Sequence, residues 1–228
     1  MTDVSSDDRV AAALRAISLI DLTDLSDDHA HTGIEALCAR ALAHGTAAVC
    51  VWPEYVSRCS SELSGSDVRV ATVVNFPSGE RPLSQVAAMT HGALDDGADD
   101  IDVVLPYRAF LAGDLATAAT MISKVTSAVH APRIVKVILE TGALGDADTI
   151  RAAADLAIEN GADFVKTSTG KIPAGASLDA ATAMLAAISA ADRSVGIKPS
   201  GGIRTFEEAL QYIGLADSVM GEGWATPE

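Results

Sequence analysis

Lysine is scarce in this chain of 228 residues, and the positions of the few lysines are informative. Only five of the sixteen basic residues are lysines, although lysine is normally frequent on protein surfaces. Lys136, Lys166, Lys171 and Lys198 lie in predicted strands or directly after them, and only Lys124 falls in a predicted helix. This placement indicates that the lysines serve a local purpose.

Cysteine pairs, net positive charge and long apolar runs are also missing. Three cysteines without a C-x-x-C spacing predict no disulfide framework, which is typical of a reducing compartment. A formal net charge of −15 argues against nucleic acid or an anionic membrane as a partner. No run reaches the roughly eighteen apolar residues of a transmembrane helix, and the acidic start is unlike a signal peptide. We expect a cytoplasmic protein.

The chain also lacks the patterns of several cofactor and nucleophile sites. No G-x-G-x-x-G follows a predicted strand, which disfavours a dinucleotide-binding fold, and no G-x-S-x-G occurs. The five histidines fall in predicted helices or at their ends, and their spacing does not match a zinc site. We therefore expect no metal and no other cofactor.

Short apolar segments alternate with helical ones along the chain, in the order strand then helix. Such apolar runs are typical of parallel strands buried on both faces. We predict an α/β fold, a single-domain (β/α)8 TIM barrel over residues 1–228, with a doubly wound open sheet as the alternative. The predicted strands are 17–23, 47–51, 68–74, 100–105, 134–139, 164–168 and 195–198. The predicted helices are 7–16, 28–44 (capped by Asp27 or Asp28), 53–63, 82–94, 114–129, 146–160, 178–190 and 205–213.

The alternation stops before a barrel is complete. The last predicted helix ends at Gly214, and residues 215–228 are too few for another strand and helix. We expect the final βα unit to be absent from this sequence. A barrel without its last strand would have two exposed edges.

Polar and charged side chains lie at the predicted strand ends, where TIM barrels carry their active sites. Three lysines close together in a low-dielectric pocket would repel, so at least one should lose its proton easily and become a nucleophile for carbonyl groups. Asp102 could be a simple ion-pair partner, but beside Lys166 and Lys198 a proton shuttle is favoured. The strand-end residues are Asp21, Thr23, Cys50, Asn75, Phe76, Asp102, Lys136, Glu140, Lys166, Thr169 and Lys198.

Two loops after consecutive strands have features of a phosphate site. Residues 169–171 read Thr-Gly-Lys, and residues 200–205 read Ser-Gly-Gly-Ile-Arg-Thr before a predicted helix. Glycines allow backbone amides to approach an anion, and a helix N-terminus favours negative charge. A tight turn would explain the glycine pair equally well, but Lys171 and Arg204 favour the phosphate interpretation.

These segments together resemble the 2-deoxyribose-5-phosphate aldolases, a family of class I Schiff-base enzymes, in order and spacing over nearly the whole chain. The family implies cleavage of 2-deoxy-D-ribose 5-phosphate to D-glyceraldehyde 3-phosphate and acetaldehyde, in deoxyribonucleoside catabolism. The family usually continues beyond the region of Trp224 into a last strand and a Gly-x-Ser-Ser loop, which this sequence lacks. The motifs are Asp21–Thr23, Asn75–Pro77, Gly97–Arg108, Lys136–Gly142, Gly161–Lys171 and Gly196–Arg204.

The resemblance assigns roles to individual residues. Lys166 would form the imine, Lys198 would lower its pKa, and Asp102 would relay protons through water. Gly170, Lys171, Gly201, Gly202 and Arg204 would hold the phosphate, and Asp21, Thr23, Cys50, Phe76, Lys136 and Thr169 would complete the substrate site. Phosphosugar and aldehyde are the implied partners, in a homodimer or homotetramer.

Two other functions are compatible with the sequence. A phosphosugar isomerase or epimerase on a barrel would need a carboxylate or histidine base but not paired buried lysines. A truncated relative that binds a sugar phosphate without turnover is favoured only by the missing last unit.

Overall fold

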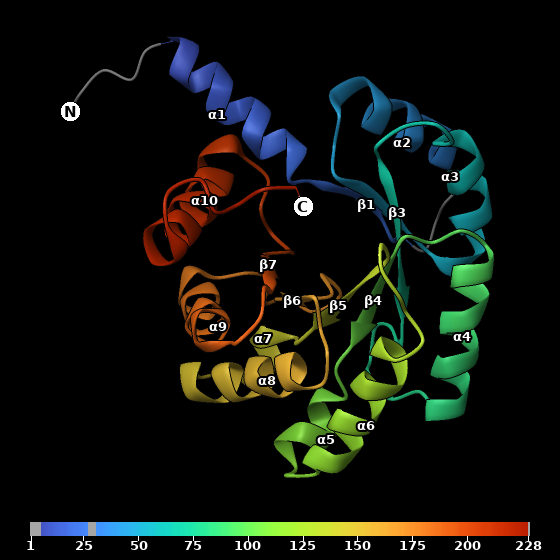
Figure 1. The fold of residues 1–228 in the computed structure, drawn as a ribbon, viewed down its shortest axis with the longest axis vertical. Coiled ribbons are helices and arrows are strands. Elements are labelled where there is room, and N and C mark those ends of the chain that lie inside the picture. Colours follow the sequence, from blue (N-terminus) through green and yellow to red (C-terminus); the bar gives the residue numbers. More distant parts are fainter. Residues whose placement is uncertain (1–5, 27–30, 228) are drawn as a thin grey trace.

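The computed structural model describes residues 6–26 and 31–227, and its centre is a sheet of seven parallel strands in sequence order. The sheet curls into an incomplete barrel with helices along its outside (Figure 1). The order follows the chain without reversal, so the doubly wound alternative is wrong and the barrel architecture is confirmed. The strands are β1 (Asp21–Asp24), β2 (Ala48–Val51), β3 (Arg69–Val74), β4 (Asp100–Val104), β5 (Ile134–Ile138), β6 (Phe164–Lys166) and β7 (Gly196–Lys198).

The helices follow the predicted pattern, with two short additions. The predicted helix at 53–63 is a 3-10 turn, η1 (Pro53–Tyr55), followed by α3 (Val56–Glu62), and α5 and α7 were not predicted. The Asp27 or Asp28 cap lies outside the described residues. The remaining helices are α1 (Ser6–Ser18), α2 (His31–His44), α4 (Leu83–Asp95), α5 (Tyr107–Leu111), α6 (Leu115–Thr126), α7 (Thr141–Leu144), α8 (Ala147–Glu159), α9 (Leu178–Ala190) and α10 (Phe206–Met220).

Local sequence explains most of the boundaries. The side chains of Asp114, Asp146, Ser177 and Thr205 accept hydrogen bonds from backbone amides at the starts of α6, α8, α9 and α10, as N-caps do. Gly161 has φ +96 where α8 turns into β6, a conformation that glycine adopts without a steric penalty. Cap chemistry therefore sets where these four helices begin, and Gly161 marks the turn into β6.

Predicted and observed boundaries differ most at β1 and α10. Helix α1 runs through Ser18, so the first strand begins at Asp21 and not at residue 17. Helix α10 passes through Gly214 and ends at Gly221, which has φ +114. Gly214 does not end the helix because isolated glycine costs only about 1 kcal/mol within a helix, a cost that packing offsets.

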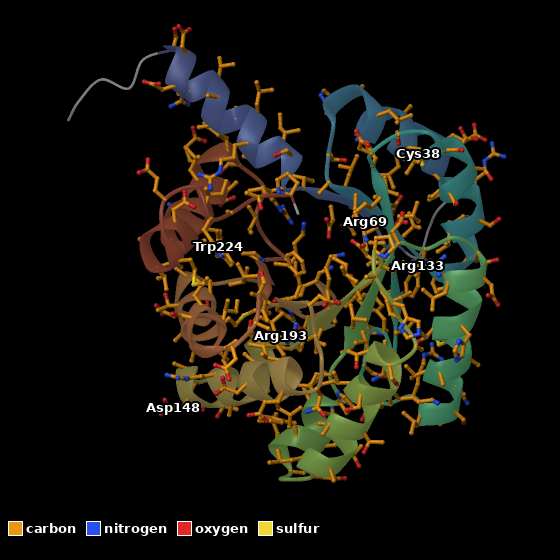
Figure 2. All side chains as sticks on the ribbon, viewed as in Figure 1. Cys38, Arg69, Arg133, Asp148, Arg193 and Trp224 are labelled. Atoms are coloured by element: carbon orange, nitrogen blue, oxygen red, sulfur yellow. The ribbon has the colours of Figure 1, made fainter. Side chains whose placement is uncertain are left out.

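Buried valine, isoleucine, leucine and alanine side chains form one continuous core. Figure 2 draws the side chains on the ribbon. All five residues of β4 are buried, in keeping with a strand covered on both faces. Among the described helices, none is both long and apolar enough to cross a membrane.

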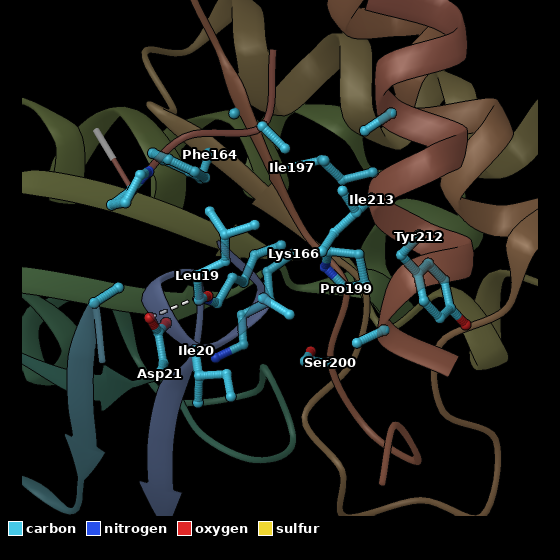
Figure 3. A pocket seen from close by; sticks show the side chains of 18 of the residues that line it. Leu19, Ile20, Asp21, Phe164, Lys166, Ile197, Pro199, Ser200, Tyr212 and Ile213 are labelled. Carbon is cyan, nitrogen blue, oxygen red and sulfur yellow. Dashed lines mark hydrogen bonds and ion pairs between the residues drawn. The ribbon is translucent and has the colours of Figure 1, made fainter. Parts of the chain in front are cut away.

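The sheet is open between its first and last strands. Within residues 6–26 and 31–227, no strand pairs with the outer edge of β1 or of β7. A cavity of about 1080 Å³ lies between these edges, lined by α1, β1, β7 and α10 and by residues of the strands between them, among them Arg69, Lys136 and Lys166. In Figure 3, Tyr212 and Ile213 of α10 face Leu19 and Ile20 across it. The expected absence of an eighth βα unit is confirmed for the described chain.

Candidate active site

Parallel register brings the predicted catalytic residues together. Asp102 on β4 is the register partner of Lys136 on β5, and Lys166 on β6 is the partner of Lys198 on β7. Asp102 is completely buried, and Lys136 and Lys166 are only 3% and 6% exposed. Lysine is almost never buried to this extent unless it is paired, so these contacts define the site.

Asp102 lies between two lysines. Its Oδ2 accepts a hydrogen bond from Lys166 Nζ at 2.6 Å, and its Oδ1 accepts one from Lys136 Nζ at 3.1 Å. Lys136 also donates to Asp100 Oδ2 at 2.7 Å, whose second oxygen accepts from Arg69 Nε at 2.7 Å. A line of alternating charges thus runs from Arg69 to Lys166.

A second branch joins β7 to β1. Lys198 Nζ donates to Asp21 Oδ1 at 2.7 Å and to the carbonyl oxygen of Leu19 at 2.8 Å. The other carboxylate oxygen of Asp21 accepts no hydrogen bond from the described residues but lies 3.5 Å from Lys136 Nζ. Lys136 therefore contacts every carboxylate of the cluster. The cluster holds three lysines and Arg69 against the three aspartates, so it has one surplus positive charge when every group is ionised.

The ionisation of Lys166 differs from the prediction. Burial acts to lower the pKa of Lys166, but the charge of Asp102, together with Cys50 and Asp21, outweighs burial, and the pKa is raised above its ordinary value. Lys136 acts in the lowering direction with a smaller effect. The easily lost proton expected among the lysines is thus not found at Lys166, because Lys166 faces the carboxylate of Asp102 and not only other lysines.

The aspartates are held in the ionised form. Burial acts to raise the pKa of Asp102, but the charges of Lys136 and Lys166 lower it. The pKa of Asp21 is lowered in the same way, against the effect of burial, by Lys136 and Lys198. The pKa of Lys136 is raised well above its ordinary value, since the charges of Asp102 and Asp21 outweigh burial.

Above Lys166 is a cavity of about 350 Å³ that is open toward the carboxyl ends of the strands. Lys166 lines it, whereas Asp102 and Lys136 lie outside its lining. Asp102 contacts Lys166, and Lys136 contacts Asp102. Predicted site residues that line this cavity are Thr23, Phe76, Lys166, Thr169, Gly170, Lys171 and Gly201. The other lining residues are Leu25, Ser26, Ile138, Ser168 and Ser200.

Several predicted residues lie elsewhere. Asp21, Lys198 and Arg204 line the larger cavity at the open edge, and Gly202 lines neither of the two cavities. Cys50 is fully buried in β2, and burial raises the pKa of its thiol to about 12. The structure therefore brings Cys50 into the vicinity of Lys166 without exposing it to the smaller cavity.

The two loops predicted to bind phosphate are neighbours. Ser200 donates from its amide to Thr167 Oγ1 at 2.9 Å and from its hydroxyl to the Ser168 carbonyl at 2.7 Å. The amide of Ala176 donates to the Gly201 carbonyl at 2.9 Å, and a Cβ on Gly175 would lie only 2.3 Å from that oxygen. The loops after β6 and β7 thus form one wall.

The start of α10 is less available to an anion than predicted. The carboxylate of Glu208 accepts hydrogen bonds from the amides of Arg204 at 2.8 Å and Thr205 at 3.0 Å, within a capping box. These two amides already have an anionic partner inside the protein.

Sequence reasoning missed residues that support the site. Trp52 follows β2, its ring packs edge to face against Phe76 with centroids 5.4 Å apart, and Lys171 Nζ lies 5.6 Å from its centroid. The Arg69–Asp100 pair was also missed, and Ser200 was given no role of its own although it begins a loop predicted to bind phosphate. Their signal was position, since each follows or lies in a predicted strand. Within the described residues, no cluster of histidine, cysteine and carboxylate side chains suits a metal ion.

Comparison with known proteins gives one consistent result. The model of the DeoC/LacD family aldolases matches residues 15–221. A deoxyribose-phosphate aldolase of Agrobacterium fabrum is 49% identical over 223 residues, covering 96% of this chain and 85% of that protein.

Solved structures of similar proteins give the same result. A crystal structure from Coccidioides immitis has a TM-score of 0.86 at 35% identity and covers 89% of this chain and 79% of that one. A tetrameric deoxyribose phosphate aldolase from Aeropyrum pernix has a TM-score of 0.79 at 28% identity, with 92% and 91% coverage.

Proposed function

This chain belongs to the DeoC/LacD family of aldolases, and from that membership we propose that it is a deoxyribose-phosphate aldolase acting through a Schiff base on Lys166. The observation that carries the proposal is the buried pair of Lys166 Nζ and Asp102 Oδ2, 2.6 Å apart beneath a cavity lined by Thr169, Gly170 and Lys171. An amine and a proton acceptor in contact are what imine chemistry requires.

The reaction begins with loss of the Lys166 proton, for which Asp102 is the acceptor in contact. The neutral amine attacks C1 of open-chain 2-deoxy-D-ribose 5-phosphate, and loss of water from the adduct leaves an iminium ion. The C3 hydroxyl lies β to this iminium carbon. When that hydroxyl loses its proton, the C2–C3 bond breaks and its electrons pass into the iminium group.

D-Glyceraldehyde 3-phosphate then leaves, and an enamine remains on Lys166. Protonation of the enamine at C2 followed by hydrolysis releases acetaldehyde and restores the amine. Asp102 and Lys198 handle the C3 hydroxyl proton by way of a water molecule, with Lys198 held by Asp21 at 2.7 Å. The surplus positive charge of the cluster favours release of one proton, although the pKa of Lys166 is raised in the free protein.

The phosphoryl group binds at the wall formed by the loops after β6 and β7. Gly170, Lys171 and Gly201 line the smaller cavity, and Gly202 and Arg204 follow in the same loop as Gly201. The substrates are therefore small molecules. The net charge of −15 disfavours nucleic acid and anionic membranes as partners.

We further propose a homodimer or homotetramer in the cytoplasm, with a role in deoxyribonucleoside catabolism and no resident cofactor. The Aeropyrum pernix relative is tetrameric, and intracellular location accords with three unpaired cysteines among the described residues.

Reductive trapping tests the proposal. Borohydride treatment with acetaldehyde should attach one ethyl group to Lys166, located by peptide mass spectrometry. Lys166→Leu should abolish trapping and turnover while the circular dichroism spectrum is retained. Lys124→Leu, on the exposed face of α6, is the matched control and should behave as the parent protein.

An unmodified Lys166 in the folded protein would refute the Schiff base. Binding of the sugar phosphate without trapping would instead support the truncated, non-catalytic alternative. An isomerase or epimerase is disfavoured by membership in an aldolase family.

A further inference from the structure

Glu140 is a buried carboxylate that the proposed reaction does not use. It follows β5 directly, its side chain is completely buried, and its backbone has φ 58 and ψ 58. This left-handed conformation is uncommon for residues other than glycine and persists only where the surroundings enforce it. A charged residue at such a position calls for a specific partner.

The partners of Glu140 lie on the loop after β6. Its carboxylate accepts a hydrogen bond from the Thr169 amide at 3.3 Å and a short one from the Thr169 hydroxyl. Thr169 Oγ1 in turn accepts a hydrogen bond from the Lys171 amide at 3.1 Å. We call these contacts the Glu140–Thr169–Lys171 chain. Within the described residues, Glu140 has no ion-pair partner, and burial raises its pKa while the bonds from Thr169 act in the opposite direction.

The backbone around Glu140 supports the same contact. The amide of Thr141 donates to the Thr167 carbonyl at 2.9 Å. A Cβ on Gly142 would lie 2.4 Å from Cβ of Ala174, so α7 packs tightly against the loop. The left-handed turn at Glu140 thus brings α7 and the carboxylate against residues 167–174.

The Glu140–Thr169–Lys171 chain leaves one backbone amide donor on the cavity side. Thr169 and Lys171 use their amides within it, whereas no hydrogen bond in the described part of the protein uses the amide of Gly170. Gly170 has φ +74 and lines the smaller cavity. Glu140 does not line this cavity and so acts through Thr169.

We infer that Glu140 is a positioning residue, which fixes the Thr169–Lys171 loop so that the Gly170 amide and the Lys171 side chain face the phosphoryl group of the substrate. This inference rests on the proposed function. Its distinguishing consequence is that Glu140 affects phosphate binding and leaves the chemistry at Lys166 unchanged.

Glu140→Gln tests the inference because it keeps the shape and removes the charge that Thr169 contacts. Two quantities are measured on the full chain: the affinity for inorganic phosphate by calorimetry, and the rate of borohydride trapping of Lys166 with acetaldehyde, which carries no phosphate. Loss of a hydrogen bond to a charged acceptor predicts about tenfold weaker phosphate binding. The trapping rate should stay within about twofold of the parent rate.

Thr141→Val is the matched control, since Thr141 is also buried in the same segment and its hydroxyl has no hydrogen-bond partner in the part of the chain that the structure describes. It should change neither quantity. Thr169→Val removes the hydroxyl through which the loop contacts Glu140, and should weaken phosphate binding as Glu140→Gln does. The second variant keeps the inference testable if the first folds poorly.

Unchanged phosphate affinity in both variants, or a trapping rate that falls by the same factor as the affinity, would overturn the positioning role. Failure of the proposed function is recognised separately, because the parent protein itself would then not be trapped at Lys166.

Discussion

Replacing Asp102 with asparagine should separate imine formation from turnover. The side chain keeps its shape in a fully buried position, but Lys166 and Lys136 lose the anion that they share. Burial and the charge of Lys136 both act to lower the pKa of Lys166, and only anionic neighbours such as Asp102 oppose them. Removing Asp102 should therefore lower the pKa of Lys166.

The separation of the two groups gives the size of this effect. Opposite charges 2.6 Å apart attract by about 6 kcal/mol at an effective dielectric constant of about 20. At about 1.4 kcal/mol per pKa unit this corresponds to an upper bound of roughly four to five units. The asparagine oxygen still accepts a hydrogen bond and Asp21 stays in place, so we expect the pKa of Lys166 to fall by about two units.

The assay is the pH dependence of borohydride trapping with acetaldehyde. Its midpoint should move down by about two pH units in Asp102→Asn, while cleavage of 2-deoxyribose 5-phosphate slows by about 100-fold or more because the proton-transfer group is lost. Asp100→Asn is the matched control, since it removes the same charge from β4 at a carboxylate paired with Lys136 and Arg69.

An unchanged or higher midpoint in Asp102→Asn would show that Asp102 does not keep Lys166 protonated. Equal shifts in the Asp100 and Asp102 variants would show that the charge of the whole cluster, and not the direct contact, sets the pKa of Lys166. Full turnover in Asp102→Asn would refute its part in proton transfer.

Two further outcomes follow from the charge count. Lys136→Met leaves one cation for each carboxylate. The free energy of unfolding measured in urea should therefore fall by about 1–2 kcal/mol, less than the roughly 3–5 kcal/mol expected when a buried ion pair is broken. The pH midpoint of trapping at Lys166 should rise. The pKa values of Asp21 and Asp102 are lower in the folded protein than in the unfolded chain, where they are about 4. The two carboxylates therefore stabilise the folded state at pH values above about 4, and this stabilisation is lost as the pH falls further. Urea midpoints should thus fall steeply below about pH 4, and less steeply in Asp21→Asn.

The fold could be predicted from the sequence because its signals are local. Apolar runs mark the strands, and side chains such as Asp146 and Ser177 cap the helices that follow. The boundary at Gly214 was wrong because packing decides whether a glycine ends a helix, and packing is not local. Strand ends also located Asp102, Lys166 and Lys198, since a parallel barrel gathers them on one side.

The electrostatics could not be predicted in the same way. Position alone indicates that lysines lie close together, and repulsion then predicts a lowered pKa. The outcome depends on which carboxylate oxygen faces which ammonium group, and those contacts arise from strand register and rotamers. Glu140 shows the same limit, because its left-handed backbone and its contact with Thr169 are properties of the packed loop.

The ion pair of Lys198 and Asp21 has a place in the fold as well as in the chemistry. Asp21 lies on β1 and Lys198 on β7, which are the two strands whose outer edges have no partner strand in the described chain. Lys198 also donates to the carbonyl of Leu19, just before β1. The contact therefore ties the open ends of the sheet together at the site. A sheet that opened there would separate Lys198 from Asp21, while Lys198 would stay beside Lys166, its register partner on β6. Asp21 consequently belongs to the charged cluster only while β1 and β7 stay close together.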